Sequence, residues 1–238
     1  MPEEHSTMPE EHSTMPEVDY SLYLVTDPAM CAAHGLRHVV HRAVSGGASI
    51  VQVRAKNAST AELIAQVQML RATVGVPVLV NDDVDAAAHA HGVHLGPSDT
   101  DPLSARQALG PSALIGLSVS SADQAQAAAQ LPAGTVDYLG VGPVWATATK
   151  PNAAAPLGPA GLPAIVRAAA GLPCVAIGGI DTARVGQLRG LGLAGICSVS
   201  EICTAQDPGE RAQALLRAWQ GPHTPAGPAR PASRTDPA

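Results

Sequence analysis

Three polar side chains occupy every second position of an otherwise apolar run at 49–56. They are Gln52, Arg54 and Lys56, and small apolar residues separate them. Successive side chains of a β-strand point to opposite faces, so these three should share one face. An amide and two cations gathered at a strand end could bind a phosphorylated ligand. The alternative is one solvent-facing side of an antiparallel sheet.

Carboxylates follow the third and fourth apolar runs of the chain. Asp82 and Asp99 would supply hard oxygen ligands, which suit a Mg²⁺ ion shared with a phosphate ester. The alternative is that such acids cap the helices that follow. We expect only capping from Asp83 and Asp85, and Asp101 remains a rival to Asp99 as the second metal ligand.

A long loop at 141–158 carries a third set of polar groups. Thr147, Thr149 and Lys150 offer two hydroxyls and an ammonium, which suit a phosphate. Gly140 and Gly142 precede this set at alternate positions. Such glycines leave one strand face without side chains, either to make room for a ligand or to allow close packing inside the protein. Residues 116, 118 and 120 repeat the pattern with glycine and two serines.

The elements that must position these groups are short apolar runs alternating with Ala-rich, helix-like stretches. This alternation predicts parallel strands joined by helical crossovers, and eight such units fit one (β/α)8 TIM barrel of the α/β class. An open doubly wound sheet is the alternative. Ser59, Ser121 and Asp181 are the expected helix caps. The expected strands are 21–27, 49–56, 76–82, 92–96, 114–120, 136–144, 173–179 and 195–200. The expected helices include 60–73, 122–131, 159–170 and 182–191.

Backbone groups dominate the ends of the last two expected strands. Gly178 and Gly179 end the seventh, and Val199 and Ser200 end the eighth. Bare N–H groups at these two places form the usual phosphate pocket of a (β/α)8 barrel. The sequence therefore predicts two anion pockets, one cationic and one built from backbone.

Composition indicates a single barrel domain between two unstructured ends. The 238 residues are 46% hydrophobic with a net charge of −6, which argues against a nucleic-acid or membrane partner. Four scattered cysteines predict core thiols and a cytoplasmic location. We expect a disordered leader with a tandem heptapeptide repeat at 1–18, the barrel at 19–220 and a disordered Pro-rich tail at 221–238. The oligomeric state, including a homo-oligomer, stays open.

Six ordered motifs between residues 22 and 219 resemble the thiamine phosphate synthase family. They are Gln-x-Arg-x-Lys56, Val-Asn-Asp-Asp-Val-Asp85, Gly-Val-His-Leu-Gly96 followed by Asp99, Gly-Leu-Ser118, Val-Gly-Pro-x-x-x-Thr-x-Thr-Lys150 and Ile-Gly-Gly-Ile180.

The resemblance implies an enzyme that joins two phosphorylated small molecules. A pyrimidine methyl diphosphate and a thiazole phosphate would give thiamine phosphate and diphosphate, with one Mg²⁺ per active site. By the same resemblance, Asp82 and Asp99 hold Mg²⁺. The pyrimidine diphosphate contacts Gln52, Arg54, Lys56, Asn81, Ser118 and Lys150, of which Arg54, Lys56, Ser118 and Lys150 are catalytic. The thiazole phosphate contacts Thr147, Thr149, Gly178, Gly179, Val199 and Ser200.

Some positions depart from the family pattern. Ala55 stands where relatives often have Glu, Pro97 where they have Gln, and Ser120 where they have His. The segment 86–91 is also about two residues shorter than usual. A related thiazole tautomerase and a non-catalytic thiamine phosphate sensor remain alternatives. Single histidines, namely His34, His38, His41 and His94, are assigned to surface or core packing.

Overall fold

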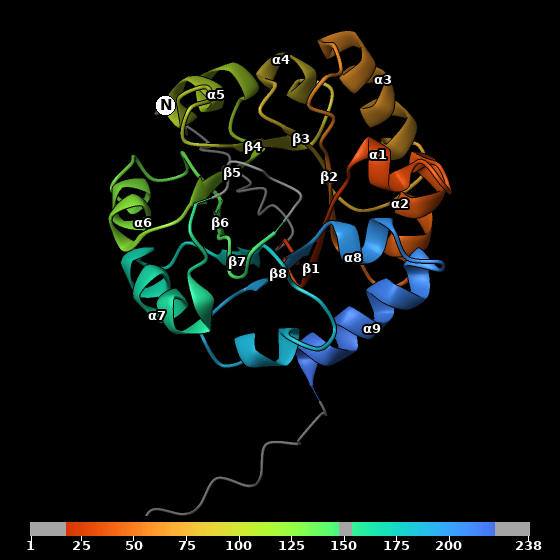
Figure 1. The fold of residues 1–238 in the computed structure, drawn as a ribbon. Coiled ribbons are helices and arrows are strands. Elements are labelled where there is room, and N and C mark those ends of the chain that lie inside the picture. The colour runs from red at the N-terminus through yellow and green to blue at the C-terminus, as the bar shows by residue number, and fades with distance from the viewer. Residues whose placement is uncertain (1–17, 148–153, 222–238) are drawn as a thin grey trace, which may run out of the picture.

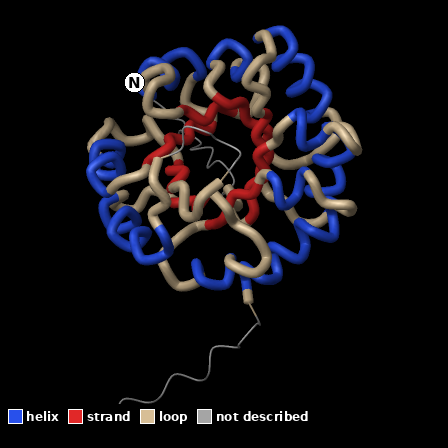
Figure 2. Tube along the Cα trace, in the orientation of Figure 1, coloured by secondary structure: helices blue, strands red, loops and turns tan. Residues whose placement is uncertain are grey.

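The computed structural model describes residues 18–147 and 154–221. Within these residues, eight strands close into one barrel in which each strand is parallel to the next and β8 pairs with β1. Figure 1 looks along the barrel, and Figure 2 shows the ring of strands inside a ring of helices. The expected (β/α)8 barrel is confirmed, and the open sheet is excluded. The strands are β1 (Leu22–Val25), β2 (Ile50–Val53), β3 (Val78–Asn81), β4 (Gly92–Leu95), β5 (Leu114–Val119), β6 (Tyr138–Val141), β7 (Cys174–Ile177) and β8 (Gly195–Ser198).

All eight strands lie within the expected ranges, and all are shorter than expected. The run at 49–56 forms a strand only as far as Val53, so Arg54 and Lys56 belong to the loop after β2. The backbone pairing between β1 and β2 ends here, because the Arg54 N–H donates to the side-chain hydroxyl of Thr26 at 3.2 Å and not to a strand carbonyl. The two cations therefore sit beyond the strand, at the mouth of the barrel.

The helices begin at side chains that satisfy their first N–H groups. Ser59 and Glu62 form a capping box at α3, and Ser121 accepts the N–H of Gln124 at α6, which confirms both expected caps. No helix in 18–147 or 154–221 is long and apolar enough to cross a membrane. The helices are α1 (Pro28–Cys31), α2 (Leu36–Ser45), α3 (Thr60–Arg71), α4 (Val84–Ala87), α5 (Pro102–Leu109), α6 (Ala122–Ala129), α7 (Gly158–Ala168), η1 (Val185–Leu188), α8 (Ser200–Cys203) and α9 (Pro208–Gln220).

The expected helix at 182–191 is wrong in extent, because only one 3-10 turn, η1, forms there. Asp181 does accept the N–H groups of Ala183 and Arg184, as a cap would. Glycines then interrupt the helix: Gly186 lies inside η1, and Gly190 follows at φ 76°. Each glycine costs a helix interior up to about 1 kcal/mol relative to alanine, so the turn does not propagate.

Two apolar layers confirm the alternation on which the strand assignments rest. One layer fills the barrel interior and includes Tyr23 and Tyr138. The other lies between strands and helices and includes Val51 and Val53, so Gln52 between them points inward. Ala55 also packs on the outer layer, as expected. All four cysteines are buried and unbridged, which confirms their assignment as core thiols.

The barrel closes where the first and last elements meet. β1 pairs with β8, and α2 packs beside α9 outside that pair. Arg42 donates two hydrogen bonds to the Asp207 carboxylate, at 2.9 and 2.7 Å. A Cβ on Gly46 would overlap the carbonyl of Gly209, so the two helices approach closely there.

One largely buried arginine, Arg106, fixes loops at the amino-terminal end of the barrel. Arg106 donates to the carbonyls of Gly110, Pro111 and Ala113 and to the Asp137 carboxylate, which lies 2.7 Å away. Asp137 also accepts the N–H of Ile115 in β5. Only 15% of the Arg106 side chain is exposed. One side chain therefore holds the connections that lead into β5 and β6.

We expect Arg106→Ala to lower the free energy of unfolding by about 2–4 kcal/mol, because three carbonyls and a carboxylate lose their donor. Arg217→Ala is the matched control, since exposed Arg217 donates only to Gln213 among the bonds found for its side chain in the described chain. Its expected cost is about 0.5 kcal/mol or less. Urea unfolding measures both, and equal losses would contradict the role given to Arg106.

Candidate functional site

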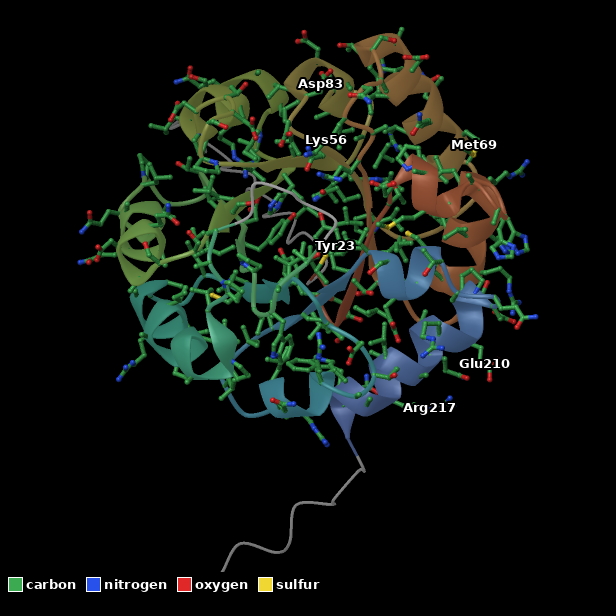
Figure 3. The ribbon with its side chains drawn as sticks, in the orientation of Figure 1. Tyr23, Lys56, Met69, Asp83, Glu210 and Arg217 are labelled. Carbon is green, nitrogen blue, oxygen red and sulfur yellow. The ribbon has the colours of Figure 1, made fainter. Side chains whose placement is uncertain are left out.

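A cavity of about 540 Å³ opens at the carboxyl ends of the strands. All eight strands, or the loops that follow them, contribute to its wall. Parallel barrels carry their binding sites at this end, because the loops there vary around a rigid scaffold. Tyr23 belongs to the wall and lies near the centre of the barrel in Figure 3.

Arg54 brings a positive charge to one side of the cavity. Its guanidinium Nη1 lies 3.7 Å from Oδ2 of Asp27, and 11% of the side chain is exposed. This ion pair orients the guanidinium without a close bidentate contact, so its donors can still serve an anion. Asn81, at the end of β3, lines the same cavity. Lys56 is exposed beyond the end of β2 and is not part of the wall (Figure 3).

Another side of the cavity is backbone. Gly178 and Gly179 follow β7 with φ of 105° and 64°, a region that favours glycine. A Cβ on Gly178 would lie 2.6 Å from Cβ of Pro143, so a side chain has no room. Val199 and Ser200 line the wall where β8 passes into α8. Exposed backbone of this kind suits a phosphate group.

Arg184 adds a second cation beside this backbone. Its Nη1 donates to the carbonyl of Gly179 at 3.1 Å, and its Nε lies 3.4 Å from Oδ2 of Asp181. The guanidinium also lies over the ring of Trp145, 5.8 Å from the centroid. Arg184 lines the cavity and holds the loops after β6 and β7 together.

Five side chains from five strands form one chain of hydrogen bonds through the cavity wall. Gln52 Nε2 donates to the hydroxyl of Tyr23, which lies 2.9 Å from the hydroxyl of Tyr138. The Tyr138 hydroxyl is 2.9 Å from Nδ1 of His94, and His94 Nε2 is 2.9 Å from Oγ of Ser118. Burial raises the pKa of both tyrosines well above the ordinary value, so each keeps its hydroxyl hydrogen.

Glycines on β5 and β6 provide the space for this chain. A Cβ on Gly116 would overlap the Tyr138 ring and meet Nδ1 of His94. A Cβ on Gly140 would lie 2.8 Å from Cε1 of His94. Gly142 instead faces the backbone of Ile177. These glycines therefore allow close packing, and Gly140 and Gly142 also line the cavity.

The two candidate metal ligands lie at neighbouring strand ends, outside the cavity wall. Asp82 follows β3 with φ 64°, an unusual conformation for a residue other than glycine, and its N–H donates to the carbonyl of His94 at 3.0 Å. Oδ2 of Asp99 accepts the N–H of Gly96 at 2.7 Å. Both residues are exposed. Asp adopts this conformation more readily than most residues other than glycine.

The neighbouring acids serve as helix caps. Asp83 accepts the N–H of Ala86 and caps α4, and Asp101 accepts the N–H of Ser104 and caps α5. Asp85 is not a cap, because it lies inside the first turn of α4. In the described ranges, no three His, Cys, Asp or Glu side chains gather as a metal cluster. Mg²⁺ often takes only one or two protein carboxylates, so the pair Asp82 and Asp99 still fits it.

Known proteins resemble this chain along most of its length. The family described as thiamine monophosphate synthase matches residues 22–202. The chain belongs to this family. A thiamine-phosphate synthase of Xanthobacter autotrophicus is 48% identical over 205 residues, covering 84% of this chain and 95% of that protein. One from a Psychrobacter species is 42% identical, covering 82% and 93%.

A solved structure places the same family on the same fold. Thiamine phosphate pyrophosphorylase from Pyrococcus furiosus superposes with a TM-score of 0.74 at 32% identity, covering 85% of this chain and 96% of that one. The resemblance inferred from six motifs is therefore confirmed, together with the TIM barrel that it implied.

The structure brings most of the residues predicted from the thiamine monophosphate synthase motifs to one cavity. Lys56, Asp82 and Asp99 lie outside its wall, and Thr149 and Lys150 lie outside the described residues. The predicted residues that line the cavity are Gln52, Arg54, Asn81, Ser118, Thr147, Gly178, Gly179, Val199 and Ser200.

Sequence reasoning missed several residues of the wall. His94 was assigned to packing, yet it bonds Ser118 in the cavity. Its signal was available, because it stands at an inward position of β4 in the motif Gly-Val-His-Leu-Gly. Tyr23, Tyr138 and Arg184 gave no such signal. Where thiamine monophosphate synthases usually carry His, Ser120 lines the cavity beside its partner Gln124.

We expect Gly140→Ala to lower kcat/KM for thiamine phosphate formation at least about tenfold, because the new methyl group displaces His94. The free energy of unfolding should fall by about 1–3 kcal/mol through overpacking. Gly161→Ala, inside α7, is the control, since its Cβ meets only Leu157 at 3.5 Å. It should keep full activity and gain up to about 1 kcal/mol. Steady-state kinetics and urea unfolding measure both; an active Gly140→Ala enzyme would refute the packing role.

Proposed function

We propose that this chain makes thiamine phosphate by joining two phosphorylated fragments. The pyrimidine methyl group leaves its diphosphate and bonds to the ring nitrogen of the thiazole phosphate. Family membership supports the reaction, and one observation on this chain carries the proposal for its site. Nine of the residues predicted from the motifs line a single cavity that has a cation on one side and bare glycine backbone on another.

The chain's own residues can stabilise the charge that develops in this reaction. The bond between the methylene carbon and the diphosphate oxygen breaks first, and the electron pair leaves with the diphosphate. Arg54 and Lys56 lie on the side where that negative charge would gather. The pyrimidine ring stabilises the resulting carbocation. No general base is needed, because the thiazole nitrogen already has a free electron pair.

The thiazole phosphate would bind at the other side of the cavity. Gly178 and Gly179 expose their backbone after β7, and Ser200 begins α8 beside them. Thr147 lines the same cavity. We assign this side to the monophosphate, because backbone N–H groups bind it without the charge that a departing diphosphate requires. Holding the two substrates on separate sides aligns the nitrogen with the carbon that it attacks.

We propose that Asp82 and Asp99 hold one Mg²⁺ at the pyrimidine side. The ion would neutralise charge on the diphosphate oxygens. The donor set fits, since Mg²⁺ prefers carboxylate oxygen and completes its shell with phosphate and water. The left-handed backbone at Asp82 holds its carboxylate at the end of β3.

The decisive experiment mixes the purified protein with both substrates and Mg²⁺ and follows thiamine phosphate by its oxidation to fluorescent thiochrome. We expect product that disappears when a chelator is added and returns with excess Mg²⁺. Thiazole phosphate binding without product would favour a tautomerase or a sensor. Product that survives the chelator would refute the metal assignment alone.

We expect Asp82→Asn to lower kcat at least about a hundredfold while thiazole phosphate binding stays unchanged. Asparagine keeps the size of the side chain and tolerates the left-handed backbone, so the change removes mainly the charge. Asp85→Asn, three residues later in the first turn of α4, is the matched control and should leave kcat intact. Kinetics and calorimetric titration with thiazole phosphate measure the two effects. Equal loss of binding and turnover would contradict two separate anion pockets.

A further inference from the structure

The hydrogens of the five-residue chain can be assigned one by one. Gln52 Nε2 can only donate, so the hydroxyl oxygen of Tyr23 accepts that hydrogen bond. The hydroxyl hydrogen of Tyr23 then points to the hydroxyl oxygen of Tyr138. The Tyr138 hydrogen then goes to Nδ1 of His94. His94 therefore carries its hydrogen on Nε2 and donates it to Ser118. If Tyr138 donated to Tyr23 instead, the Tyr23 hydroxyl hydrogen would have no acceptor among the five side chains.

This direction fixes what the two ends of the chain offer to a ligand. Gln52 uses its amino half on Tyr23, which leaves the amide oxygen as its accepting end. Ser118 uses its oxygen as an acceptor for His94, which leaves the hydroxyl hydrogen as a donor. Both side chains line the cavity. The hydrogen-bond chain thus presents one fixed acceptor, the Gln52 amide oxygen, and one fixed donor, the Ser118 hydroxyl, to a ligand.

A 4-aminopyrimidine has the complementary pattern. Its amino group donates, and its ring nitrogen accepts. A 4-oxopyrimidine of almost the same size reverses both, because the carbonyl accepts and the neighbouring ring nitrogen carries a hydrogen. In the oxo compound, two acceptors would face each other at one end and two donors at the other, and all four groups would lack a partner. This mismatch discriminates between the two pyrimidines far better than shape alone.

We propose that Tyr23, Tyr138 and His94 are positioning residues that fix this polarity and thereby select the aminopyrimidine over its oxo analogue. The inference rests on the proposed function, since it concerns the pyrimidine side of the same cavity. Tyr23 and Tyr138 are 2% and 1% exposed, so water does not replace their bonds. Gly116 and Gly140 would collide with the rings if they bore side chains, so the barrel is built around this chain.

The test uses two unreactive ligands in which a methylene group replaces the oxygen of the breaking bond. One is the 4-aminopyrimidine diphosphate analogue, and the other is its 4-oxo counterpart. Calorimetric titration gives a dissociation constant for each, and their ratio measures the selection. Partial unfolding of a variant raises both apparent dissociation constants by the same factor, so their ratio is unaffected.

We expect the native chain to bind the amino ligand about a hundredfold more tightly than the oxo ligand. Tyr23→Phe frees the Gln52 amide to rotate, and Tyr138→Phe releases the His94 tautomer. Each change should lower the ratio at least about tenfold. Tyr20→Phe is the matched control and should keep the native ratio. The ring centroids of Tyr20 and Tyr138 are 5.2 Å apart, but the Tyr20 hydroxyl is not one of the groups in the five-residue hydrogen-bond chain.

The outcomes separate this inference from the proposed function. A native chain that forms no thiamine phosphate would refute the function itself. If product forms but the native ratio is near one, or if both tyrosine variants keep the native ratio, only the inference is overturned. A loss of selection in Tyr20→Phe as large as in Tyr138→Phe would also overturn it, because the effect would then come from aromatic packing.

Discussion

The interior of an eight-stranded barrel has room for a fixed number of inward side chains, and this steric limit governs the whole site. Two large rings, those of Tyr138 and His94, occupy more of the interior volume than two ordinary inward side chains would. This volume is available because Gly116 and Gly140, which lie against the rings, have no side chains. The hydrogen-bond chain, the shape of the cavity and the orientation of Ser118 all depend on this exchange of volume.

The cavity binds negative charge in two physically different ways. Around Arg54 the field comes from a side-chain cation held by Asp27. Around Gly178 and Gly179 it comes from backbone dipoles that no side chain covers. A cation suits a group whose charge grows during the reaction, whereas backbone dipoles suit a group that stays unchanged. The barrel separates the two by placing them after different strands, β2 and β7.

The sequence predicted the barrel because period-two alternation and glycine endings are local signals. The same logic located Gln52, Arg54 and the glycines after β7. It failed at 182–191, where the capping residue Asp181 predicted a helix and the effect of two glycines, Gly186 and Gly190, was underestimated. It also missed the tyrosine pair, since Tyr23 and Tyr138 are 115 residues apart and meet only through the closure of the barrel. The inward position of His94 could be read from its motif, but its partners Tyr138 and Ser118 could not.

The seam between β1 and β8 also governs how the protein can be made. The first strand leaves the ribosome early, and the strand that completes its pairing, together with Asp207 opposite Arg42, arrives 165 or more residues later. Until then β1 has an open edge, which is the feature that invites pairing with other chains. The nascent barrel therefore carries an exposed strand edge until β8 has been synthesised.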